Sequence, residues 1–284
     1  MARRIKVSSV ILNMRTHPHN PDIYANLIAD LFDRRRPVKI HGDRYGLISL
    51  IHRDPTDNGF VSGTITTFVK VEFDGNWFDA ENMKPATVDD VSQVVIPENL
   101  YPNSATFYFE YDIRKHFLYV QSYSDGKVLS ARQAQNLFRG LTEDAKIIDK
   151  YGKIHVTIKQ SSDGLSKLFS LKIIKKISIT IYKPNPDIFS DSFEADVEAA
   201  LAAANSQSIT ITYDAEPRDS LIPTREIREI SQAALENGYV KVEGRDETGR
   251  VARSTEQMPA ELHDKYDPEN TAERTAFRGL IPRW

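Results

Sequence analysis

Apolar and polar residues alternate along much of the first half of the chain. This pattern predicts strands, because successive side chains of a strand point to opposite faces. We predict strands over residues 4–14, on both sides of the H-G-D turn within 37–51, over 59–73, as a hairpin within 105–123, and over 153–159. Apolar residues spaced three and four apart predict helices over 21–34, 129–148 and 163–171. Ser130 is a suitable N-cap for the second of these helices.

The second half begins near Lys175. We predict a strand over 176–182, a helix over 190–204, a strand over 207–213, a helix over 224–236 and a hairpin over 239–254. Strands and helices intermix without strict alternation, which favours the α+β class with mixed, mainly antiparallel sheets. The predicted domains are an N-terminal α+β domain with a basic patch (1–174), a smaller two-layer α/β domain (175–257) and an extended C-terminal tail (258–284). Pro and Asp residues predict a long connection over 80–102.

The motif N-P-D-I-aromatic occurs twice, beginning at Asn20 and at Asn185. Each copy follows an alternating strand and precedes a predicted helix. Asn is a good N-cap, Pro suits the first helical position, and Asp in the first turn complements the helix dipole. A phosphate bound at the same helix start would be repelled by that Asp. We therefore favour two helix starts over a binding loop used twice.

The composition excludes several kinds of chemistry. The 284 residues include no cysteine, which excludes disulfides, cysteine zinc sites, iron–sulfur clusters and thiol catalysis and suits a reducing compartment. The sequence shows neither a signal peptide nor a run of 18 apolar residues, so we expect a cytoplasmic protein without a membrane span. It also lacks the Walker A, G-x-G-x-x-G and H-E-x-x-H motifs, and we expect neither a cofactor nor a bound metal.

The net charge of −3 is unevenly distributed. Residues 1–53 contain ten Lys or Arg and four Asp, a local charge of +6, which indicates an anionic partner. Arginine forks match phosphate oxygens, so we predict a nucleic-acid-binding surface composed of Arg3, Arg4, Lys6, Arg34, Arg35, Arg36, Lys39 and Arg44. The alternative is that these cations only complement a helix C-terminus. A second basic set is interpreted as a solvated face: Lys167, Lys172, Lys175, Lys176 and Lys183.

Candidates for catalysis are few. His17 and His19 with Asp22, or His41 with Asp43, have residue types found in metal and general-base sites, but H-x-H alone has low specificity. The stretch D-G-N-W-F-D-A-E (74–81) has four oxygen-bearing side chains but lacks the EF-hand spacing. There we favour a turn followed by a buried Trp-Phe pair. A metal-dependent nuclease is the enzymatic alternative.

The order of several motifs resembles the bacterial domain-of-unknown-function family 4747. These motifs are K-V-S-S-V-I-L-N-M-R-T-H-P, R-R-P-V-K-I-H-G-D-R-Y, G-T-I-T-T-F, F-D-G-N-W-F-D, I-P-E-N-L-Y-P-N and I-T-I-Y-K-P-N-P-D-I-F. The family name implies no activity. More distantly, the plan is similar to that of the phage-exclusion sensor RexA and the Kiwa defence protein KwaB. The shared features are a mixed N-terminal domain, an L-S-x-x-Q helix and a strand of the type I-x-I-x-I-x-K-P. This resemblance implies DNA binding in phage defence or prophage exclusion.

We therefore expect a non-enzymatic protein of such a system, which binds the phosphate backbone of double-stranded DNA with little sequence specificity and forms a homo-oligomer. Two alternatives stay open beside it. One is an interaction subunit whose tail docks a partner protein of the defence system. The other is the metal-dependent nuclease.

Overall fold

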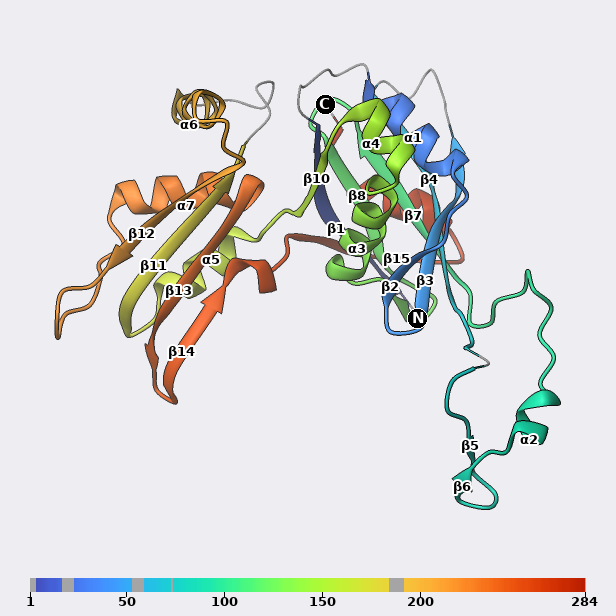
Figure 1. Cartoon of the computed structure of the whole chain (residues 1–284). Helices are drawn as coiled ribbons and strands as arrows, with labels where there is room; N and C mark the ends of the chain where they lie inside the picture. Colours follow the sequence, from blue (N-terminus) through green and yellow to red (C-terminus); the bar gives the residue numbers. More distant parts are fainter. Residues whose placement is uncertain (1–3, 17–22, 53–58, 73, 184–191, 284) are drawn as a thin grey trace.

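The computed structural model describes residues 4–16, 23–52, 59–72, 74–183 and 192–283 (Figure 1). Its larger sheet has nine strands in the order β10-β1-β8-β7-β4-β3-β2, with β15 paired to β1 and β9 paired to β8. All these pairings are antiparallel. The strands are β1 (Ile5–Thr16), β2 (Val38–His41), β3 (Arg44–His52), β4 (Phe60–Val69), β7 (Ala105–Asp112), β8 (Phe117–Ser124), β9 (Lys127–Val128), β10 (Ile154–Ile158) and β15 (Glu261–Tyr266).

Helices cover both faces of this sheet. Side chains of β1 alternate between the faces: Leu12 packs in one apolar core and Ile11 in another. The first core includes residues of α1 (Ile23–Asp33), α3 (Ala131–Thr142) and α4 (Ala145–Tyr151). The second is closed by Phe277 of α8 (Glu273–Leu280), which is fully buried. The sheet is therefore the middle of three layers.

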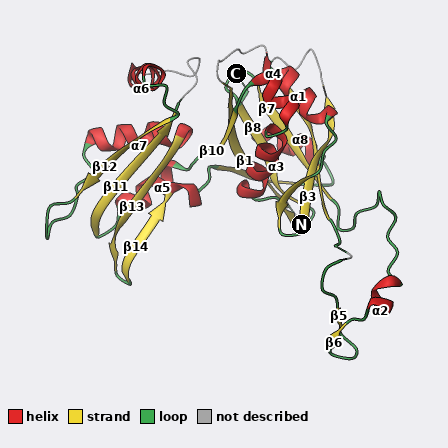
Figure 2. Ribbon diagram, in the orientation of Figure 1, coloured by secondary structure: helices red, strands yellow, loops and turns green. Residues whose placement is uncertain are grey.

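A second, four-stranded antiparallel sheet lies beside the first and has the order β12-β11-β13-β14 (Figure 2). Its core includes residues of three helices, of which α7 packs on β11 and β13. The elements are α5 (Ser162–Phe169), β11 (Ile173–Tyr182), α6 (Ser192–Ala203), β12 (Ser208–Asp214), α7 (Arg225–Asn237), β13 (Gly238–Asp246), β14 (Gly249–Ser254) and the 3₁₀ helix η2 (Thr255–Gln257). None of the described helices is long and apolar enough to cross a bilayer.

The α+β class predicted from the sequence is confirmed. Ser130 caps α3 as predicted, because its hydroxyl accepts a hydrogen bond from the Gln133 amide and its own backbone amide donates one to the Gln133 side-chain oxygen. The helix predicted over 129–148 is two helices, because Asp144 leaves the helical conformation and caps α4. Both copies of the N-P-D motif lie outside the described residues.

Residues 258–284, predicted as an extended tail, hold β15 and α8 within their described part. β15 pairs with β1 along the six positions from Ile5 to Val10. β10 pairs with one edge of β1 only from Leu12 onward. β15 pairs with the remaining part of the same edge. The polar character of this segment reflects strand and helix faces that contact water on one side.

A projecting arm follows β4. We use "the arm" for residues 70–104, which include β5 (Phe78–Asp79), β6 (Lys84–Pro85) and α2 (Val88–Ser92) and extend away from both sheets (Figure 1). None of its described residues is buried. The sequence prediction of a buried Trp77-Phe78 pair is wrong for Phe78, whose exposed fraction is 61%. The physical reason is that the short arm folds back on itself without an apolar core.

Candidate nucleic-acid interface

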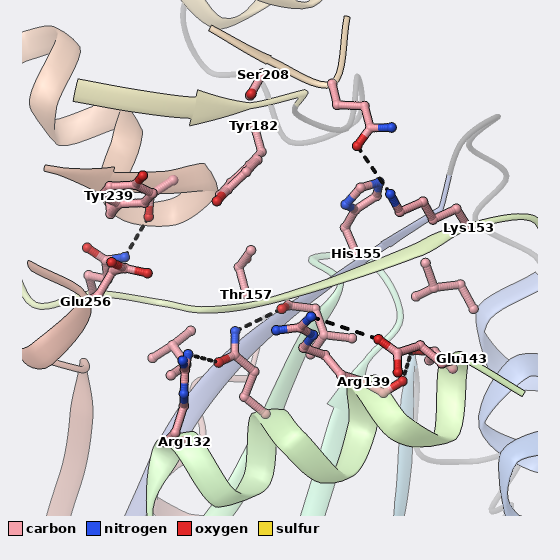
Figure 3. Close-up of a pocket in the computed structure, with 18 of the residues that line it drawn as sticks. Arg132, Arg139, Glu143, Lys153, His155, Thr157, Tyr182, Ser208, Tyr239 and Glu256 are labelled. Carbon is pink, nitrogen blue, oxygen red and sulfur yellow. Dashed lines mark hydrogen bonds and ion pairs between the residues drawn. The ribbon is translucent and has the colours of Figure 1, made fainter. Parts of the chain in front are cut away.

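A cleft of about 600 Å³ lies between the two sheets (Figure 3). One wall is formed by α3 and β10, and the other by the adjoining ends of β11, β12 and β13. Both walls come from segments far apart in the sequence, so the cleft exists only once the two sheets are assembled.

Helix α3 contributes two arginines to the cleft. Its apolar face, which includes Leu137 and Phe138, is fully buried in the core. Arg132 and Arg139, seven positions apart and so nearly two helical turns, lie together on the opposite face. The mostly buried Gln135 lies between them, where it accepts a hydrogen bond from Arg132 (2.9 Å) and donates one to the Val156 carbonyl of β10 (3.0 Å). These two hydrogen bonds of Gln135 fix the position of Arg132 relative to β10.

Strand β10 is an edge strand with two different faces. Ile154, Val156 and Ile158 are buried in the first core. Lys153, immediately before the strand, and His155 alternate with them and line the cleft. The strict period of two in K-I-H-V-T-I-K therefore places these two side chains on the cleft side of the strand.

The opposite wall carries two tyrosines. Tyr182 ends β11, and Tyr239 lies near the start of β13, with ring centroids 6.4 Å apart and ring planes at 52°. Burial, followed by the neighbouring Tyr239, raises the pKa of Tyr182, so its phenol is neutral at physiological pH. At one end Lys153 donates a hydrogen bond to the Gln207 side chain (3.2 Å) and joins the two walls.

A buried arginine supports the cleft from beneath. Arg15 of β1 is fully buried and donates hydrogen bonds to Asn237 Oδ1 (2.8 Å) and the Lys183 carbonyl (3.2 Å), both in the second half of the chain. Burial lowers the pKa of Arg15 to about 10, so the side chain is still charged at neutral pH. Among the described residues no carboxylate forms an ion pair with it. Its hydrogen bonds therefore join β1 to the end of β11 and the start of β13, beside the cleft.

Two further hollows adjoin the cleft. A small hollow of about 200 Å³ shares Lys153, His155 and Tyr182 with it and adds Lys183. Another of about 620 Å³ shares Arg132 with the cleft and extends past the start of α3 to Lys6. We call these three connected spaces the α3–β10 groove. Its described ionised side chains are five cations and three carboxylates, a balance of +2: Lys6, Arg132, Arg139, Lys153 and Lys183 against Glu143, Glu256 and Glu261.

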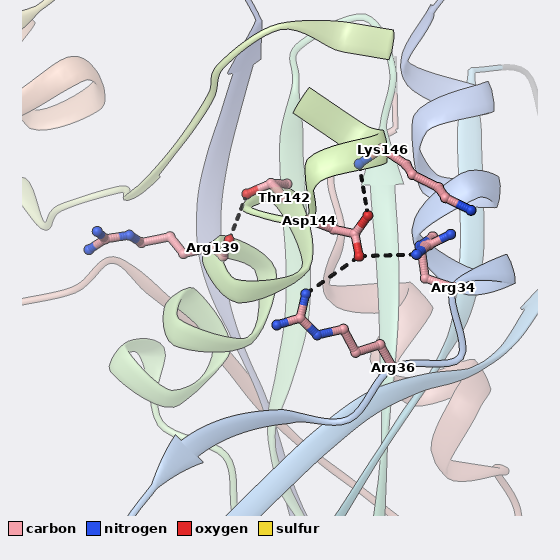
Figure 4. Close-up of polar contacts among 6 residues, drawn as sticks. All are labelled: Arg34, Arg36, Arg139, Thr142, Asp144 and Lys146. Atoms are coloured by element: carbon pink, nitrogen blue, oxygen red, sulfur yellow. Dashed lines mark hydrogen bonds and ion pairs between the residues drawn. The ribbon is translucent and has the colours of Figure 1, made fainter. Parts of the chain in front are cut away.

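The arginine run that the sequence singled out is partly engaged within the protein. Arg34 and Arg36 both contact Asp144 Oδ2, at 3.2 and 3.4 Å (Figure 4). Desolvation raises the pKa of Asp144, but the Lys146 amide and the two guanidinium groups outweigh it, so the pKa lies below its usual value. These two arginines thus fix the start of α4 to the end of α1.

The other predicted residues are dispersed. Arg3 lies outside the described residues, whereas Arg4, Lys6, Arg35 and Lys39 are exposed. Arg44 donates hydrogen bonds to the Val128 carbonyl (3.3 Å) and Thr67 (3.2 Å). Of the described members of the predicted surface, Lys6 lines the α3–β10 groove. Lys183, assigned from the sequence to a solvated face, lines the small hollow.

The histidine candidates receive little support. His17, His19 and Asp22 lie outside the described residues. His41 and Asp43 flank the turn between β2 and β3, and the described part of the chain holds no group of three metal-ligating side chains.

Arg132, Arg139, Lys153 and His155 were missed as site residues. A signal did exist for part of this set, because the strand predicted over 153–159 places Lys153 and His155 on one face. That this face meets two tyrosines across a cleft depends on how the sheets pack.

The model of one protein family, described as a domain of unknown function (DUF4747), matches residues 5–282. The match spans both sheets, the arm and the C-terminal helix. A search of curated proteins finds no match to the chain. Since the family model covers nearly the whole sequence, the chain belongs to the DUF4747 family.

Proposed function

We propose that this protein binds single-stranded nucleic acid along the α3–β10 groove. The observation that carries the proposal is the pairing of cations on one wall with two tyrosines on the other. Proteins that hold single strands combine a positively charged groove for the backbone with aromatic rings on which unpaired bases stack. A duplex offers no free base faces to such rings, so the groove favours a single strand over the double-stranded DNA expected from the sequence.

The roles follow from the geometry. Arg132, Arg139 and Lys153 lie along one wall and neutralise successive phosphates. Tyr182 and Tyr239 face them, and their rings are tilted by 52°, so each ring presents a face of its own to a base. No described side chain reads base edges in an evident pattern, and binding is expected to depend weakly on sequence.

The test is a salt series on labelled single-stranded DNA, single-stranded RNA and duplex DNA. If all five groove cations contact phosphates, the plot of log affinity against log salt has a slope of about −3.5 for single strands. The variant Arg132→Ala/Arg139→Ala/Lys153→Ala removes three cations and reduces the slope to about −1.4. An unchanged slope, or absence of binding at low salt by the unaltered protein, contradicts the proposal.

A matched triple variant tests the surface predicted from the sequence. Arg4, Arg35 and Lys39 are exposed and do not line the groove. Their replacement by Ala removes the same charge as the groove variant. If only this variant reduces the slope of log affinity against log salt, the surface predicted from the sequence binds the nucleic acid and the groove does not.

Stacking is tested separately from charge. Tyr182→Ala/Tyr239→Ala is expected to weaken single-strand binding by about 1–3 kcal/mol per stacked base at unchanged salt slope. The variant Tyr182→Phe/Tyr239→Phe keeps the rings and is expected to keep the affinity. Loss of affinity in the Phe variant would assign the effect to the hydroxyl groups.

The role in phage defence or prophage exclusion rests on the resemblance in plan to RexA and KwaB and stays a prediction. It is checked by plaque counts on cells that carry the gene with the groove triple or with the Arg4/Arg35/Lys39 triple.

A further inference from the structure

The arm exposes an unusual amount of apolar surface. Seven of the twelve large apolar side chains that are exposed in the described part of the chain lie in it: Phe78, Met83, Val88, Val94, Val95, Leu100 and Tyr101. The exposed fraction is 86% for Val88 and 85% for Val95. Monomeric proteins rarely leave such clusters in water, and clusters of this kind mark interaction surfaces.

Local polar contacts give the arm its shape. Thr87 and Asp90 form a capping box at the start of α2, and Asp79 accepts a hydrogen bond from the Asn82 side chain (2.7 Å) in the β5–β6 turn. At its base Phe68 stacks on Tyr101 with centroids 4.5 Å apart. The arm therefore presents its apolar side chains in a defined arrangement.

The arm is also strongly acidic. Its seven Asp and Glu residues against two Lys give a net charge of −5. The basic stretch 34–44 contains five cations and one Asp, a net charge of +4. The Lys70 amide donates a hydrogen bond to the Asp43 carbonyl (2.9 Å), so this stretch reaches the base of the arm.

We propose that the arm docks on a second copy of this chain and that two copies exchange arms. Two arms lying antiparallel bring the acidic tip of each to the basic stretch at the base of the other. A two-fold arrangement makes the contact twice and leaves no arm unmatched. Nucleic acid and an unrelated acidic protein are excluded as occupants because the arm would repel both.

Four exposed charged residues can be replaced to test this contact. Arg35 and Lys39 are exposed on the body, and Glu81 and Asp89 are exposed on the arm. Within the described part of the chain no side-chain hydrogen bond or ion pair engages these four, unlike Arg34 and Arg36, which contact Asp144. Reversing their charges therefore breaks none of the described side-chain contacts.

The experiment is sedimentation velocity on the full chain, freed of nucleic acid, with a charge-swap pair. The unaltered protein is expected to be a dimer that dissociates as salt rises. Arg35→Glu/Lys39→Glu and Glu81→Lys/Asp89→Lys are each expected to be monomers, because arm and body then carry like charges. Mixing the two variants restores both contacts and the dimer.

Apolar variants test the same contact by another route. Phe78→Ser/Val88→Ser is expected to give a monomer with unchanged circular dichroism, whereas Ile222→Ser, which alters an equally exposed side chain (78%) outside the arm, leaves the dimer intact. A monomeric unaltered protein, a charge-swap variant that dimerises alone, or a mixture that stays monomeric overturns the proposal.

Discussion

The buried carboxylate Glu110 of β7 anchors the C-terminal helix to the first sheet. Its side chain is 2% exposed and contacts Arg278 Nε at 2.8 Å and the Arg283 guanidinium. The Arg283 guanidinium also lies over the Phe60 ring, 4.4 Å from its centroid. The substitution Arg278→Met/Arg283→Met keeps most of the side-chain volume but removes both guanidinium partners from the carboxylate.

The cost follows from burial. Breaking a buried ion pair on one side costs about 3–5 kcal/mol, because a charge is left in a low-dielectric site. The arginine side chains are 36% and 35% exposed, so solvent screens part of their contribution. We expect the free energy of unfolding to fall by about 2–4 kcal/mol after this discount.

The assay is urea unfolding followed by tryptophan fluorescence and circular dichroism. Adding Glu110→Gln to the double Met variant removes the buried charge and is expected to restore most of the lost stability. Arg225→Met serves as a control, because its ion pair with Glu229 is exposed (92% and 61%) and is expected to change stability by less than about 1 kcal/mol. A loss below that of the control, or a triple variant no more stable than the double, refutes the reasoning.

Two further predictions concern packing and titration. Gly140→Ala in α3 places a Cβ 2.3 Å from Val38 Cγ1 and is expected to cost about 1–3 kcal/mol in urea unfolding. Gly279→Ala in α8 meets no atom within 4 Å and should stabilise the protein by about 0.5–1 kcal/mol. Burial raises the pKa of Tyr119 to about 12, so the stability that its neutral phenol contributes is present below pH 10 and is lost as the pH rises toward 12. The drop in urea midpoint between neutral and alkaline pH should therefore be larger for the unaltered protein than for Tyr119→Phe.

Strands and helix starts were predictable because their causes are local. Ser130 and Gln133 lie three positions apart and form the capping box that their spacing indicates. The alternation in residues 153–159 fixes which side chains of β10 are buried. The cap at Asp144 is also local, since its carboxylate accepts a hydrogen bond from the Lys146 amide, and it was missed. Its contacts with Arg34 and Arg36 come from more than 100 positions away and were not predictable.

The groove was not predictable for the same reason. Lys6, Arg132, Lys153 and Lys183 lie on four different segments, and no run of cations links them in the sequence. The run that is visible, R-R-R, owes two of its members to an internal ion pair with Asp144. A dense cluster of cations in a sequence therefore does not by itself indicate an anionic ligand. A carboxylate of the same chain can pair with such cations within the fold.

The two proposed surfaces separate the possible uses of the basic stretch. If the arm of a second copy covers Arg35 and Lys39, these residues are not free to contact phosphates in the dimer. Replacing them by Ala together with Arg4 should then shift the protein toward monomer and leave the salt slope of nucleic-acid binding unchanged. The variant Arg132→Ala/Arg139→Ala/Lys153→Ala should reduce the salt slope and leave the dimer intact, since α3 and β10 lie apart from the arm (Figure 1). The positive excess of residues 1–53 would then serve self-association, and nucleic-acid binding would depend on cations drawn mainly from the rest of the chain.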